Sequence, residues 1–212
     1  AIEIFPNKNL KPEKGYSAEL GLKQGFKFGK KSNVTGYFDV AGFWNQYDNM
    51  MEFMFGTFGD PSKGLGAGFS SQNIGTTRIL GVDAALGIQA VVKTVTFNFL
   101  GGYTFINSKA LNWDKPLVLY NMVGDTLKPN NGDPIYGPLI QKAYNGANAP
   151  AGFDTVNQLT YGMTSSSKTN TLKYRPVHQF KLLFNIDHKR FDFNIDYQFI
   201  SYQGNIDYAF VS

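Results

Sequence analysis

The sequence predicts an all-β fold: about six long antiparallel strands that form a segment of a transmembrane β-barrel. Three observations support this fold class. Apolar and polar residues alternate with period two along much of the chain, and short connections alternate with long ones. The composition is also unusual, because aromatic residues make up 16% of the 212 residues and charged residues only 17%, against about 25% charged in typical soluble domains.

The alternation is clearest in "LKYRPVHQFKLLFNID" (172–187), where one parity is apolar and the other is mostly polar or charged. The next segment, "RFDFNIDYQF", continues the pattern after a tight turn. The strands expected from this signal are 16–27, 34–53, 73–91, 94–109, 172–187 and 190–203.

The last two strands are expected to form a hairpin that pairs Phe184 with Phe193 and Lys181 with Asp196. This register keeps aromatic residues on one face and opposite charges on the other. Pro176 cannot donate a hydrogen bond to a neighbouring strand, so a bulge or a break in pairing is predicted there.

Connection length separates the two ends of the predicted sheet. "FGKKSN", "VVKT" and 187–190 are short, whereas 54–72 and 110–171 are long and rich in Gly, Asn, Pro and Ser. Outer-membrane barrels have this asymmetry, with short periplasmic turns and long external loops. An unbroken strand over 34–53, tilted by about 45°, would rise roughly 45 Å, more than the ~25 Å apolar band of such barrels.

Several other classes of protein are disfavoured. The chain has no Cys, which excludes disulfides and thiolate sites, and its basic residues form no stripe suited to nucleic acid. No apolar run approaches the ~18 residues of a membrane helix. The opening residues do not resemble a signal peptide, so the chain is either cytosolic or an interior piece of a longer processed protein.

Charged residues on the polar parity are predicted to face a water-filled lumen. They are dispersed along the strands and converge on no pocket, so an enzyme with paired carboxylates is not expected, and no cofactor or metal is predicted. The predicted lumen-facing residues are Glu19, Lys23, Asp39, Asp83, Lys173, Arg175, Lys181, Asp192 and Asp196.

Aromatic residues are divided between two roles. Trp44, Tyr103 and Tyr174 are expected in an aromatic girdle at the lipid interface, with His178 nearby on the same face. Trp113 lies at the base of the longest loop. Trp113, Tyr120 and Tyr144 are the candidate contacts to a ligand or to a lid protein.

Three motifs resemble the barrel of TonB-dependent outer-membrane receptors. "NKNLKPEKGYSAELGLK" is similar to their Asn-x-x-Leu-x-Pro-Glu segment and the strand after it. "NIGTTRILGVDAAL" is similar to their Asn-x-Gly turn, with Asp83 in the acidic position, and "LKYRPVHQFKLLFNI" to their Tyr-Arg-Pro-x-His strand. The motifs occur in the family's order, and their style resembles receptors of Bacteroidetes, among them the SusC-like kind.

The resemblance implies a 22-stranded barrel closed by a plug, in the outer membrane of a Gram-negative bacterium. Residues 1–212 would be part of that barrel, with loops 54–72 and 110–171 outside the cell and with the plug and the final strands absent. Such receptors import a scarce glycan, peptide, siderophore or vitamin with energy from TonB, some with a surface lipoprotein lid. The implied partners are lipid, the plug and remaining strands, TonB and such a lid, with no nucleic acid. A passive porin-like barrel and a soluble glycan-binding β-sandwich are the alternatives.

Overall fold

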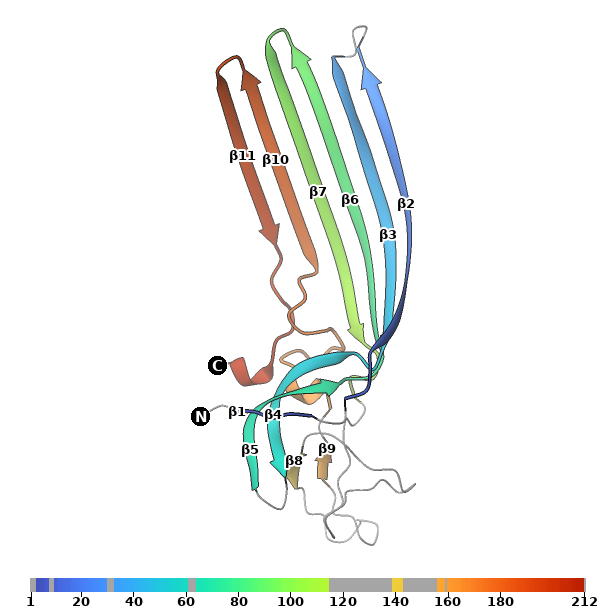
Figure 1. The fold of residues 1–212 in the computed structure, drawn as a ribbon, viewed down its shortest axis with the longest axis vertical. Helices are drawn as coiled ribbons and strands as arrows, with labels where there is room; N and C mark the ends of the chain where they lie inside the picture. Colours follow the sequence, from blue (N-terminus) through green and yellow to red (C-terminus); the bar gives the residue numbers. More distant parts are fainter. Residues whose placement is uncertain are drawn as a thin grey trace.

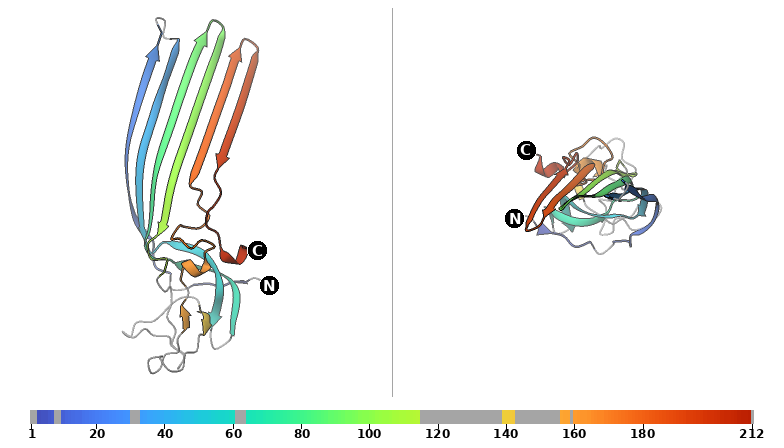
Figure 2. Two further views of the ribbon diagram at one scale, coloured as in Figure 1. Left: turned by 180° about the vertical axis from the view of Figure 1, so that it is seen from behind. Right: turned by 90° about the horizontal axis from the view of Figure 1, so that it is seen from above.

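The computed structural model describes residues 3–7, 10–29, 33–60, 64–114, 139–142, 156–158 and 160–211. Its main feature is one antiparallel sheet of six strands in the order β11-β10-β7-β6-β3-β2 (Figure 1). Seen along the strands, the sheet is curved (Figure 2). Its strands are β2 (Lys14–Phe28), β3 (Val34–Asp48), β6 (Thr77–Val92), β7 (Val95–Ala110), β10 (His178–His188) and β11 (Phe191–Ile200).

Each strand pairs with the strand of this sheet that follows it along the chain, so that β3 pairs with β6 and β7 with β10. The short turns of the hairpins lie at one end of the sheet. β2 and β3 have 15 residues and β6 and β7 have 16. With a tilt of about 45°, fifteen residues rise about 35 Å, enough to cross the apolar band of a barrel. β2 and β11 each have one edge with no partner strand among the described residues.

The second predicted strand, 34–53, does not continue to residue 53. It ends at Asp48, because Asn49 takes a positive φ of 55° and turns the chain. The stretch 54–72, expected to be loop, is instead most of a hairpin made of β4 (Met51–Asp60) and β5 (Gly64–Asn73). This hairpin crosses under the end of the sheet, where β1 (Glu3–Ile4) adds to β5 (Figure 1).

The fifth predicted strand is also shorter than expected. β10 begins at His178, so residues 172–177 lie outside the sheet and Tyr174 adopts a positive φ of 57°. The predicted break at Pro176 is confirmed. In the chain that the structure describes, the other short elements are β8 (Leu139–Lys142), β9 (Val156–Gln158) and the 3-10 turns η1 (Gly162–Thr164) and η2 (Tyr208–Phe210).

The register of the last hairpin differs from the prediction by two residues. The turn consists of Lys189 and Arg190, so His188 pairs with Phe191 and Phe184 pairs with Ile195. Lys181 therefore lies opposite Gln198 instead of Asp196. A shift of two residues keeps every side chain on its predicted face, because the period of a strand is two.

The register of all six strands gives the sheet one apolar and one polar face. Aligned positions on the apolar face include Leu22, Val40, Ala84, Tyr103, Phe180 and Phe199. No second sheet covers this face in the described chain: Leu20 is 85% exposed and Tyr197 53%. The described residues therefore lack the two packed sheets that a β-sandwich requires.

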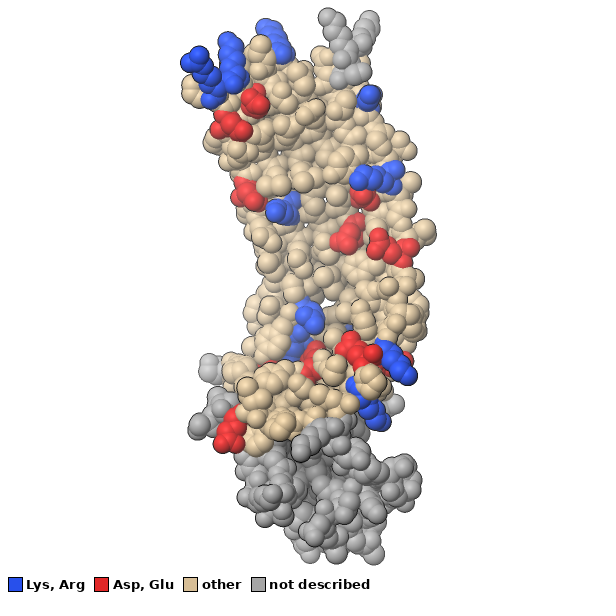
Figure 3. All heavy atoms as spheres, viewed as in Figure 1, with Lys and Arg blue, Asp and Glu red and all other residues tan. Residues whose placement is uncertain are grey.

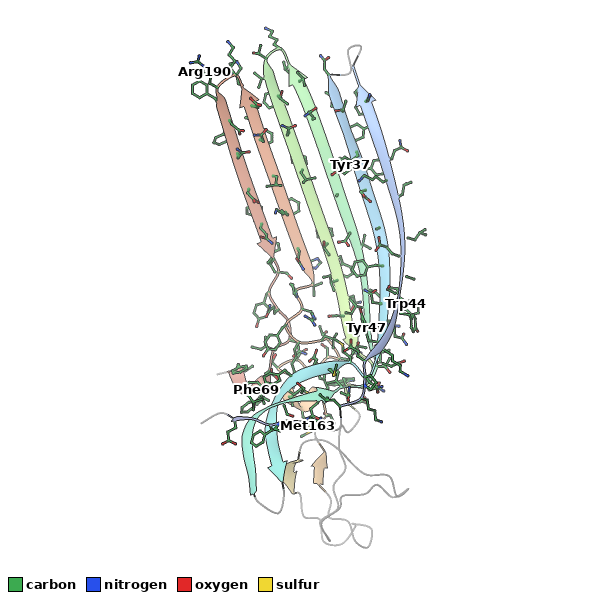
Figure 4. The ribbon with its side chains drawn as sticks, viewed as in Figure 1. Tyr37, Trp44, Tyr47, Phe69, Met163 and Arg190 are labelled. Atoms are coloured by element: carbon green, nitrogen blue, oxygen red, sulfur yellow. The ribbon has the colours of Figure 1, made fainter. Side chains whose placement is uncertain are left out.

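The buried core lies at the long-connection end, and apart from Ala110 of β7 its residues lie outside the six-stranded sheet. Met50, Met54, Ile74, Ala110, Tyr161 and Leu172 form it, and Tyr47, Ile79 and Trp113 pack against it. Figure 4 places Phe69 and Met163 at this end and Arg190 at the opposite tip. No helix in the described part of the chain is long and apolar enough to cross a membrane.

Candidate functional site

The polar face of the sheet carries most of the charged residues singled out from the sequence. Lys23 and Asp39 are cross-strand partners, and Nζ of Lys23 lies 3.6 Å from Oδ2 of Asp39. Asp83 accepts a hydrogen bond of 2.5 Å from Oγ1 of Thr104, its partner on β7. Both side chains of the Lys23–Asp39 pair are substantially exposed, so the pair contributes little to stability.

These charged residues surround a shallow groove of about 480 Å³ in the middle of the polar face. Three carboxylates (Glu19, Asp39 and Asp83) and the ammonium of Lys181 line the groove. The sequence places these residues far apart, and the register of four strands brings them together. The mixture of charges suits contact with water and polar solutes, whereas the described residues contain no cluster suited to a metal ion.

A row of amides crosses the same face nearer the short turns. Gln89 donates to Asn98, Asn98 donates to Asn185, and Asn185 donates to Asn194, with distances of 2.8–2.9 Å. Asp192 accepts from both Asn185 and Asn194 at 2.6 Å. The row lines a second groove of about 560 Å³, which Asp196 also borders. These amides were not among the residues predicted to face the lumen, because that prediction covered only charged side chains, although the amides share a parity on successive strands.

Lys173 and Arg175 do not belong to this polar face, because both precede β10. Lys173 is buried at the other end of the sheet, where its Nζ lies 2.5 Å from Oδ1 of Asp207 and 2.6 Å from Oγ1 of Thr164. Its ammonium also lies 4.9 Å from the centre of the Tyr161 ring. The assignment of Lys173 to the polar side of a strand is therefore wrong.

Glu52 completes this buried group, which we call the loop-end cluster: Glu52, Tyr161, Thr164, Lys173 and Asp207. The Tyr161 hydroxyl accepts from the Lys173 backbone N–H at 2.7 Å and donates to Glu52. Burial raises the pKa of Glu52 above its usual range, against the opposing attraction of Lys173. Burial also lowers the pKa of Lys173, although the hydrogen bond and the charge of Asp207 act in the opposite direction. Burial raises the pKa of Tyr161.

Two of the three motifs meet at the long-connection end of the sheet, and the third contributes Lys173 to the loop-end cluster. Asn73 of the "NIG" motif accepts from the backbone N–H of Lys11 and donates to its carbonyl oxygen, at 2.8 and 3.0 Å. It donates as well to the carbonyl oxygen of Asn49, at 2.6 Å. Gly75, with a φ of 91°, then turns the chain into β6. The motif residues thus connect β2, β3, β5 and β6 where the strands leave the sheet.

The aromatic residues singled out from the sequence do not all lie where they were predicted. Trp44 and Tyr103 lie on the apolar face as expected, and Tyr103 hydrogen-bonds His178 through its hydroxyl at 2.8 Å. Tyr174 is not on that face, since its hydroxyl donates to Asp207. Trp113 packs against the buried core, and Gly162 lies so close that a Cβ there would be 2.6 Å from its ring. Tyr120 and Tyr144 lie outside the described residues.

Comparison with known proteins identifies one family. The family model described as "TonB dependent receptor-like, beta-barrel" matches residues 1–211, almost the whole chain. A search of curated proteins finds no match. Members of this family are receptors and transporters of the outer membrane, not enzymes.

Proposed function

The chain belongs to the TonB-dependent receptor-like β-barrel family, and we propose that it forms the C-terminal part of a barrel that imports a scarce nutrient. In this proposal a plug closes a 22-stranded barrel, and TonB transmits the energy that displaces the plug. β2 and β11, whose outer edges have no described partner, pair with neighbouring strands of the same barrel.

The uncovered apolar face supports this proposal most strongly. Paired rows of mostly apolar side chains extend across the sheet. Many of these side chains are more than one-third exposed, including Leu22, Val40, Leu86, Tyr103 and Phe193. Monomeric soluble proteins rarely expose an apolar surface this extensive. Lipid around the barrel would cover it, and the polar face with its two grooves would then border the lumen.

The difference between the two ends of the sheet suggests the orientation. The short turns would face the periplasm, and the β4–β5 hairpin with residues 110–171 would face the outside of the cell. The cargo is a glycan, peptide, siderophore or vitamin, with Trp113, Tyr120 and Tyr144 as contacts to it or to a lipoprotein lid. We further propose a Gram-negative host of Bacteroidetes type and a SusC-like receptor.

Site-specific labelling of the full-length receptor in intact cells tests this orientation. The chain has no Cys, so single cysteines can be introduced at Lys168, in the loop-end segment, and at Lys93, in a short turn. A membrane-impermeant maleimide should label Lys168→Cys and leave Lys93→Cys unlabelled until the cells are opened. Labelling of Lys93→Cys alone in intact cells would reverse the orientation.

Dependence on TonB tests the mechanism separately. Growth on the limiting nutrient should require both the receptor and TonB. Uptake that persists without TonB would identify a passive porin-like barrel, whatever the labelling experiment shows.

A further inference from the structure

Basic residues occupy the tips of two neighbouring short turns. Lys93 lies in the β6–β7 turn, and Lys189 and Arg190 form the β10–β11 turn. The two turns are adjacent because Val95 pairs with His188 at the end of the β7–β10 ladder. All three basic residues are exposed, and Figure 3 shows basic side chains gathered at this end of the molecule. We call Lys93, Lys189 and Arg190 the basic turn rim.

The backbone conformation of these two turns favours residues other than Lys. Lys93 has a φ of 56° and Lys189 a φ of 57°, and both take the first position of a two-residue hairpin turn. Gly, Asn and Asp are strongly preferred at such positions, because a larger side chain is strained at positive φ. The backbone conformation of the turns therefore does not account for the presence of Lys in both of them.

Apolar residues lie directly beside the rim, on the face assigned to lipid. Val92 ends β6 and Phe191 begins β11, next to the basic turns, and they are 56% and 78% exposed. Both lie on the apolar face, in register with its other residues. Exposed apolar side chains next to basic turns match the boundary between acyl chains and headgroups in a bilayer.

The carboxylates of Asp187 and Asp192, near the basic turn rim, lie on the polar face of the sheet and not on its apolar face. Asp187 and Asp192 pair with each other on the polar face of the sheet. The Asp192 carboxylate accepts hydrogen bonds from Asn185 and Asn194 on that same face. The negative charges at this end therefore face away from the apolar surface.

We infer that the basic turn rim binds the phosphate headgroups of anionic phospholipid in the leaflet that surrounds the short turns. The inference rests on the proposed function, since it requires the apolar face to lie in a bilayer. Lipid attached at the rim would fix the depth of this side of the barrel and would favour phosphatidylglycerol over phosphatidylethanolamine.

Lipid binding by the full-length receptor tests the inference. The receptor is titrated in detergent with phosphatidylglycerol or phosphatidylethanolamine, and bound lipid is counted by native mass spectrometry. The test variant combines Lys93→Asn, Lys189→Asn and Arg190→Gln, since Asn suits the positive φ of the turns and should preserve the hairpins. Affinity for phosphatidylglycerol should fall about fivefold for each charge removed, with phosphatidylethanolamine binding unchanged.

The control variant carries Lys11→Gln, Lys14→Gln and Lys168→Gln, three exposed lysines at the opposite end of the sheet. It should retain the wild-type preference, and added salt should weaken that preference in both proteins. The inference is overturned if the rim variant keeps the wild-type preference for phosphatidylglycerol or if the control variant loses it. A receptor that fails to enter lipid nanodiscs at all would instead disprove the membrane proposal, and this inference with it.

Discussion

Lys173 and Asp207 form an ion pair inside the loop-end cluster, with Nζ and Oδ1 2.5 Å apart and both side chains at most 3% exposed. The pair joins the segment before β10 to the segment after β11. Asp207 also accepts from the Tyr174 hydroxyl at 2.8 Å, and Asn205 donates to the carbonyl oxygen of Thr171. These contacts hold the two segments together where neither belongs to the sheet.

Replacement of Lys173 by Met should destabilise this end of the molecule by about 3–5 kcal/mol, because Asp207 would remain charged and buried without its partner. Hydrogen exchange over residues 160–211 of the full-length receptor measures the loss. Lys168→Met, at an exposed position in the same segment, is the control and should have little effect.

A second substitution separates the pair from the packing around it. Adding Asp207→Leu to Lys173→Met should restore part of the lost protection, because it removes the unpaired charge of Asp207. Equal protection in the wild type and in Lys173→Met would show that the pair contributes nothing to holding the segments.

Glu52 should make the loop-end cluster sensitive to pH. Burial raises its pKa above the usual value of about 4.5, so the folded state binds the proton more tightly than the unfolded state. Its contribution to stability is then full below pH 4.5 and is lost as pH rises through the raised pKa. Glu52→Gln, which stays neutral, should be more stable than the wild type at neutral pH, with a difference that shrinks toward pH 4.5.

Thermal unfolding of the wild type and of Glu52→Gln between pH 4 and pH 8 measures how their difference in stability changes with pH. Glu13→Gln is a suitable control, since Glu13 is an exposed carboxylate near the same end of the sheet. A constant difference between Glu52→Gln and the wild type across the whole range would contradict the assignment of the pH effect to Glu52.

The two faces of the sheet could be predicted from the sequence because period-two alternation is a local signal. It assigned Leu182 and Phe193 to the apolar face and Lys181 and Asp192 to the polar one, and the pairing confirms these faces. The exact partners were missed, since alternation fixes only the parity of a register. The two-residue turn of Lys189 and Arg190 sets the register of this hairpin. Lys is not one of the residues that mark the first position of such a turn in a sequence.

The loop-end cluster could not be predicted in the same way. Lys173 continues the alternation of β10 in sequence, and only the break at Pro176 separates it from the strand. Its partner Asp207 is 34 residues away, in a segment without periodicity. Glu52 was assigned to the end of the strand predicted over 34–53, whereas it belongs to the separate strand β4. Their association depends on long-range packing, which no local pattern encodes.

Asn73 should be important for the junction of the strands. Asn73→Ala removes all three of its hydrogen bonds to Lys11 and Asn49 and should cost about 1–3 kcal/mol. Asn73→Asp keeps the acceptor for the Lys11 N–H and loses both donated bonds, so it should have an intermediate effect. Limited proteolysis near residues 10–13 of the full-length receptor should be slowest in the wild type, intermediate in Asn73→Asp and fastest in Asn73→Ala. If Asn73→Ala were cleaved no faster than the wild type, Asn73 would not hold the junction together.

Leu182 and Leu183 offer a direct comparison of the two faces. They are neighbours in β10, but Leu182 lies on the apolar face and Leu183 lines a groove of the polar face. If lipid covers the apolar face, Leu182→Arg should cost about 2–4 kcal/mol near the middle of the bilayer, whereas an Arg on the lumen side should cost far less. Reversible unfolding of the full-length receptor from lipid vesicles measures both. Equal costs for the two variants would show that the two faces border the same environment, and the assignment of the apolar face to lipid would then fail.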